Sequence, residues 1–203
     1  MNPHGEIFET KARGTLMGNR GRALHDDRGQ IVRLFDGQRW ITCLLEFKGR
    51  QRKVMSPRLY TELFFLDEAV ALAAGHRPCA ECRRERFNAF VSSWKESTGR
   101  DQGSSLLAPE IDRELHPARI GRSLEKITYQ APLESLPDGC FVQNENGSCL
   151  VWEGSLLLWS AEAYTKKEPQ PVGLIVEVLT PEPTVRCLRS GYRPEIHKSA
   201  FAL

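Results

Sequence analysis

Hydrophobic positions come in short runs in the first third of the chain, separated by glycine and charged residues. Residues 39–47 (RWITCLLEF) and 52–55 (RKVM) are two β-forming runs around a Gly-containing turn, which predicts a hairpin. Residues 61–66 (TELFFL) predict a further strand. Residues 1–38 are rich in Gly and Arg and predict turns and close backbone approaches instead of regular structure.

Helical patterning begins at residue 67. Asp67 is suited to the N-cap, the run EAVALAA consists of helix formers, and Gly75 suits the left-handed position after the helix. Pro78 prevents this helix from continuing. A second helix is predicted by an apolar stripe with helical spacing at Phe87, Phe90, Val91 and Trp94. A third is predicted over residues 109–115, with a proline in its first turn.

The chain beyond residue 132 is patterned mainly as strands. Short apolar runs alternate there with turn sequences such as NENG, and residues 173–180 (GLIVEVLT) predict another strand. Residues 181–191 predict a short helix that ends at a glycine. The predicted class is α+β, in which residues 1–96 form a hairpin and two helices, residues 97–108 a polar linker, and residues 109–203 a β-rich unit.

Composition is that of a soluble protein. The 203 residues are 40% hydrophobic and 27% charged, and no apolar run approaches the ~20 residues of a bilayer span. The N-terminus has no apolar signal-peptide core. We therefore expect a cytoplasmic protein with no membrane partner, in which the six cysteines are thiols or metal ligands and not disulfides.

The clearest chemical signal is Cys79-Ala80-Glu81-Cys82, which has the spacing of half a tetrahedral zinc site. No second Cys-x-x-Cys exists, so isolated residues would have to complete the site. Two alternatives stay open. The thiols could cap a helix without metal, or they could end a zinc deaminase site whose His-x-Glu element is His4-Gly5-Glu6.

Residues 61–86 resemble the metal-binding module at the N-terminus of the Ada DNA-repair methyltransferase. The resemblance rests on a strand, an Ala-rich helix and then AGHRPCAEC, residues 74–82. It implies an α+β zinc module with a DNA-binding role. The family's upstream ligand pair is absent, so methyl transfer is not carried over. His25, in a Gly-x-x-x-His strand end, and Cys43 would complete a Cys₃His site holding one zinc ion.

Charge is distributed unevenly along the chain. Residues 1–60 carry 12 Lys and Arg against 6 Asp and Glu, whereas residues 61–203 carry 16 against 20. A basic segment of this kind is compatible with a nucleic-acid partner. Arg77, Arg83 and Arg84 are the predicted phosphate contacts, although Glu81 and Glu85 could pair with them along the helix.

Three histidines lie beside charged residues and support an alternative function. His25, His116 and His197 could act as acid–base groups of a nucleic-acid hydrolase or deaminase-like enzyme, in a cleft between the two units. Walker, Gly-x-Ser-x-Gly and Rossmann sequences are absent. The main hypothesis is therefore a zinc-binding protein, with zinc mainly structural, that binds or acts on nucleic acid. A metal-free interaction protein is the third alternative.

Overall fold

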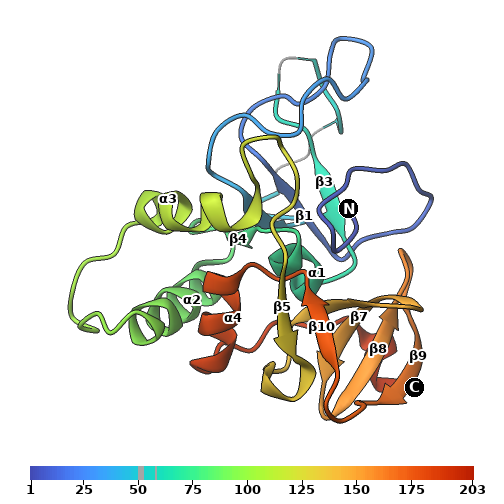
Figure 1. The fold of residues 1–203 in the computed structure, drawn as a ribbon. Coiled ribbons are helices and arrows are strands. Elements are labelled where there is room, and N and C mark those ends of the chain that lie inside the picture. Colours follow the sequence, from blue (N-terminus) through green and yellow to red (C-terminus); the bar gives the residue numbers. More distant parts are fainter. Residues whose placement is uncertain (50–52, 58) are drawn as a thin grey trace.

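A four-stranded sheet with the strand order β3-β1-β2-β4 forms the N-terminal part of the fold. The computed structural model describes residues 1–203 except 50–52 and 58 (Figure 1). β1 is antiparallel to both β2 and β3, and β2 is parallel to β4. The strands are β1 (Leu16–Asn19), β2 (Ile41–Leu44), β3 (Leu63–Phe65) and β4 (Arg77–Pro78).

The two faces of this sheet have different surroundings. Phe65 on β3 is buried in an apolar cluster with helix α1 (Glu68–Ala73), which covers one face. The cross-strand register places Met17 opposite both Cys43 and Phe64, so these three side chains lie on the other face. Phe64 is 37% exposed. That second face is therefore open to a ligand.

Helix α1 is short, but all six of its residues are buried. The Val70 amide donates to Asp67 Oδ1 at 3.0 Å, and Gly75 has a φ of +83° just beyond the last turn. Both predicted ends of this helix are thus confirmed. The side chain of Glu68 accepts a hydrogen bond from the Tyr192 hydroxyl at 2.6 Å, which attaches the C-terminal segment to the start of α1.

The predicted helix after the Cys-x-x-Cys is α2 (Arg84–Ser97), and it buries the apolar stripe of Phe87, Phe90 and Trp94. The third predicted helix is also present and runs four residues further than expected. None of the helices in the described part of the chain has the length and apolar character that crossing a membrane requires. The remaining α-helices are α3 (Ala108–Arg119) and α4 (Glu182–Arg189).

A six-stranded antiparallel sheet makes up most of the C-terminal part, in the order β5-β10-β6-β7-β8-β9 (Figure 1). This confirms the α+β class and the β-rich character beyond residue 132. Its elements are β5 (Tyr129–Pro132), β6 (Phe141–Asn144), β7 (Gly147–Trp152), β8 (Ser155–Trp159), β9 (Tyr164–Pro169) and β10 (Ile175–Val178), with 3₁₀-helices η1 (Leu133–Ser135) and η2 (Lys198–Phe201).

The N-terminal sheet differs from the prediction in two ways. Residues 1–38 are not wholly irregular, because they contain β1. The predicted hairpin is wrong: residue 52 lies outside the described residues, residues 53–55 contain no strand, and β2 pairs with β1 instead. Gly18 makes the close backbone approach predicted for this segment, but it does so within β1. A Cβ at Gly18 would lie 2.2 Å from the Ile41 carbonyl oxygen, so this glycine permits close strand approach and marks no turn.

Residues from both sides of the predicted linker share one apolar cluster. Phe90 and Trp94 of α2 pack in it with Ile111 of α3 and Val178 of β10. The loop between α2 and α3 coincides with the polar run at residues 97–108, as its composition suggests. The division into two units at that loop stays a prediction.

Candidate metal centre

Three cysteines from different elements come together beside β4. The Sγ atoms of Cys43, Cys79 and Cys82 all lie within 4.8 Å of one another. The Cys79 amide donates to the Thr42 carbonyl at 2.9 Å, and this parallel pairing of β2 and β4 sets Cys43 beside Cys79. The turn before α2 returns Cys82 to the same point. Three of the four predicted ligands are thus gathered in one place.

His25, the fourth predicted ligand, lies elsewhere. No histidine or carboxylate of the described residues belongs to the cysteine group. His25 is buried, with Nδ1 2.7 Å from Thr61 Oγ1, just before β3. β3 and β4 are the two edge strands of the sheet, so His25 lies beside one edge and Cys79 beside the other. Neighbouring strands of a sheet lie about 4.8 Å apart. His4, from the deaminase alternative, contacts Gln143 Oε1 at 2.9 Å and is likewise outside the group.

The thiols interact strongly with one another. Hydrogen bonds with Cys43 and Cys82, and from the amides of Cys82 and Glu81, lower the pKa of Cys79 far below its ordinary value. The pKa of Cys43 is raised far above its ordinary value because its thiol donates to Cys79 and Cys82 and because it is buried. These contacts favour a thiolate at Cys79, where a cation would be stabilised.

The geometry fits a soft metal ion. With Zn–S bonds of about 2.3 Å, sulfur ligands at the corners of a tetrahedron lie about 3.8 Å apart. The 4.8 Å limit on the three Sγ separations is compatible with that arrangement after a small contraction. The Glu81 amide also donates to Cys79 Sγ at 3.4 Å, as backbone amides in a Cys-x-x-Cys turn do toward a thiolate.

A groove of about 800 Å³ lies over the cysteines, and we call it the cysteine groove. Its floor is the open face of the first sheet, including Met17, Cys43 and Phe64. Its walls are Leu44 at the end of β2, residues 45–47 after it, residues 80–82 and the first turn of α3. All three cysteines line it, so a metal held by them would face this groove.

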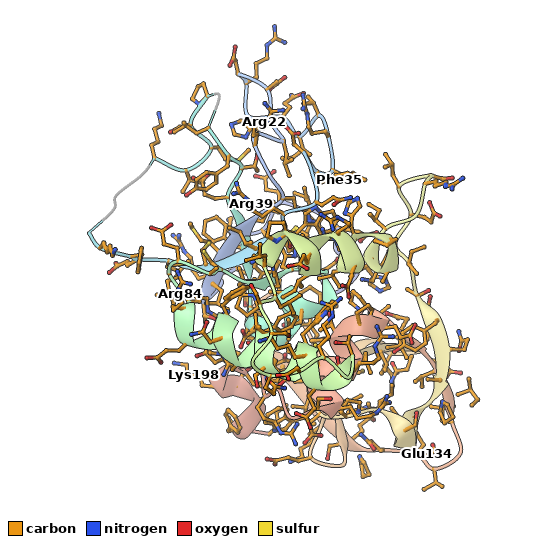
Figure 2. All side chains as sticks on the ribbon, turned by 90° about the vertical axis from the view of Figure 1, so that its left-hand side faces the viewer. Arg22, Phe35, Arg39, Arg84, Glu134 and Lys198 are labelled. Carbon is orange, nitrogen blue, oxygen red and sulfur yellow. The ribbon has the colours of Figure 1, made fainter. Side chains whose placement is uncertain are left out.

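Two of the three arginines predicted to contact phosphate are instead buried in ion pairs. The Arg77 guanidinium makes two hydrogen bonds to Asp112, at 2.8 and 2.7 Å. Arg83 is 1% exposed at its side chain and pairs with Glu68 at 3.0 Å and Glu195 at 2.5 Å. The charges of both guanidinium groups are therefore already paired with carboxylates, although Arg77 also lines the cysteine groove. Arg84 is exposed; Figure 2 labels it at the start of α2, with Arg39 above it.

The three predicted catalytic histidines have different surroundings among the described residues. His25 lies beside Thr61, and His197 accepts a hydrogen bond from the Ser199 amide at 3.3 Å. His116 packs edge-on against Phe35, and burial lowers the pKas of both His116 and His197. Neither of the two cavities described in this part of the structure is lined by any of the three. The histidine-lined cleft therefore stays a prediction.

His76, next to Gly75 in the motif that carries the resemblance, is a core residue. Its ring is 0% exposed and packs against Phe65 and Trp40, with centroid distances of 4.8 and 5.5 Å. Burial, and then the charges of Arg20 and Arg119, lower the pKa of His76 well below its ordinary value. A neutral ring in the core explains why this position holds a histidine without making it a ligand.

Sequence reasoning missed the groove residues Met17, Phe64 and Arg39. Met17 lies opposite Cys43 only because of the β1–β2 register, and β1 itself was not predicted. A hydrophobic run that alternates over four residues and contains a glycine gives too weak a signal to reveal such a strand.

In comparisons with known families, curated proteins and solved structures, nothing matches this chain at a significant level, so the Ada-like resemblance stays a hypothesis.

Proposed function

We propose that this chain is a zinc-binding protein in which Cys43, Cys79 and Cys82 hold one zinc ion. The observation that carries the proposal is the approach of the three Sγ atoms to within 4.8 Å of one another. Thiolates are preferred zinc ligands, and the Cys-x-x-Cys turn supplies backbone amides that stabilise them. Two of the ligands come from one turn and the third from a strand about 40 residues earlier in the sequence.

Such an ion would have a structural effect whatever else it does. It would join β2 to the turn that begins α2, and so fix the β4 edge of the sheet. Because the binding site exists only in the folded chain, the free energy of zinc binding adds to the stability of the folded state. The stabilising effect of the proposed ion supports the structural role that the sequence predicts for zinc.

Removing Cys79 is expected to abolish zinc binding. Mass spectrometry of metal content on untagged protein, expressed with added zinc, should find about one zinc per chain in the wild type. Cys79→Ser should reduce it to background, because two scattered thiols hold zinc weakly. Cys149→Ala, which removes a buried thiol outside the group, should keep its zinc. Zinc affinity should fall as the pH falls, since protons compete for the thiolates.

Two outcomes would contradict the zinc proposal. One is a wild-type protein without zinc after zinc-supplemented expression. The other is a folded Cys79→Ser protein that keeps its full zinc content. Circular dichroism of the variant shows whether it is folded, and a chelator titration of the wild type gives the affinity against which the variant is compared.

Nucleic acid is the partner we propose for this face. The favouring observation is that Arg13 and Arg39, from the basic segment 1–60, are exposed and line the cysteine groove, with exposed Arg84 nearby. Binding to single-stranded DNA and RNA should be measurable at low salt and weaken as salt rises. Arg39→Glu with Arg84→Glu should reduce it, whereas Lys167→Glu on β9 should have a smaller effect. Undetectable binding at low salt would contradict this partner.

A further inference from the structure

We propose that a metal at Cys43, Cys79 and Cys82 keeps a fourth coordination position open to the cysteine groove, and that this position binds a small thiol with an apolar body as its thiolate, whose proton is released to the solvent. The inference rests on the proposed zinc site and adds the class of ligand.

The open position follows from the number and placement of the protein ligands. Structural zinc sites are closed by four protein ligands, whereas sites that bind a substrate have three and leave one position free. No ligand atom of a further His, Cys, Asp or Glu among the described residues lies within 4.8 Å of all three Sγ atoms, although Glu46, Glu62 and Glu81 line the same groove. All three cysteines line one groove of about 800 Å³, a volume within the range of small-molecule sites. An external molecule can therefore reach the metal.

The preference for a thiol follows from the donor set. Three thiolates make the metal a soft acceptor, and soft acceptors favour sulfur over carboxylate or water oxygen. The side chain opposite Cys43 in the sheet is Met17, whose thioether is itself soft and polarisable. The surroundings of the position are thus compatible with a sulfur-containing ligand and offer it no competing imidazole among the described residues.

The apolar body follows from the groove surface. Leu44, Leu45 and Phe64 line it and are 37%, 48% and 37% exposed. Met17 and Ile41 add further apolar area to its floor. Large hydrophobic side chains that gather at a concave site with a few polar groups are typical of small-molecule binding. A thiol with an aromatic or aliphatic body would cover them while its sulfur reaches the metal.

The test uses the 203-residue chain loaded with Co²⁺ in place of zinc, with benzyl mercaptan as the probe. Adding one sulfur ligand to three should raise the sulfur-to-cobalt charge-transfer absorption by about one third. Benzyl mercaptan should saturate this change at about a tenfold lower concentration than 2-mercaptoethanol, because its ring covers apolar surface. Phe64→Ala should remove most of that advantage, so that the two thiols saturate the change at similar concentrations.

Three controls make the result decisive. Benzyl alcohol, which has the ring but no thiol, should leave the cobalt spectrum unchanged. A cobalt-loaded protein whose spectrum responds to neither thiol, or responds to imidazole alone, would overturn the inference while leaving the metal site intact. A Met17→Leu protein with an altered cobalt spectrum before any thiol is added would show that Met17 fills the position, and would also overturn it. A chain that binds neither cobalt nor zinc would overturn the proposed function, and the inference with it.

Discussion

Glu68→Ala is expected to lower the free energy of unfolding by about 3–5 kcal/mol, the usual cost of breaking a buried ion pair. The Glu68 side chain is 1% exposed and pairs with Arg83 at 3.0 Å and with Arg86 at 2.7 Å. It also accepts the hydroxyl hydrogen bond of Tyr192. Removing the carboxylate leaves the guanidinium of Arg83 buried with one remaining partner, the largely exposed Glu195.

Urea denaturation followed by circular dichroism measures this effect. The matched control is Glu114→Ala, since Glu114 pairs with Arg100 but both side chains are more than a third exposed. Exposed pairs of this kind contribute about 0–1 kcal/mol. If the two variants lost the same small amount of stability, the buried cluster around Glu68 would not be a main support of the fold.

Local sequence signals were sufficient for the helices around the site. Asp67 and Gly75 mark the two ends of α1 because a capping carboxylate and a residue with positive φ are needed at the chain positions where they occur. The spacing of Phe87, Phe90 and Trp94 predicted α2 because only one face of that helix is buried. These signals involve residues within about two turns of one another.

Contacts between distant segments could not be predicted in the same way. Cys43 was predicted as a ligand from its chemistry, but its place beside Cys79 depends on the parallel pairing of β2 with a two-residue strand. His25 was predicted from its place in a Gly-x-x-x-His strand end, and it lies by the opposite edge, near Thr61. The partner of Arg77 is 35 residues away in the sequence. Sheet register and long-range ion pairs follow from tertiary packing, which no local pattern encodes.

Asp112→Ala is expected to be the second severe substitution, with a loss of about 3–5 kcal/mol. The side chains of Arg77 and Asp112 are 2% and 6% exposed, and their two hydrogen bonds join β4 to α3. Arg77 also donates a hydrogen bond to the carbonyl oxygen of Pro78 at 3.0 Å, and Pro78 is the residue directly before Cys79. The lost carboxylate would therefore leave a buried charge unpaired and free the backbone that positions a metal ligand.

The Asp112→Ala substitution should also weaken zinc binding, an effect that replacing an ordinary buried residue would not have. If zinc binds as proposed, a chelator competition should show about 10–100-fold weaker affinity in Asp112→Ala, the usual loss when a partner that orients a ligand is removed. Arg113→Ala, an exposed neighbour on α3, should change stability by less than about 0.5 kcal/mol and leave zinc affinity unchanged. Asp112→Asn should fall between the two, because an amide keeps one acceptor oxygen for Arg77. An Asp112→Ala protein that is folded and binds zinc as tightly as the wild type would show that the Arg77–Asp112 pair supports the fold alone, and that Cys79 is positioned by the β2–β4 pairing without it.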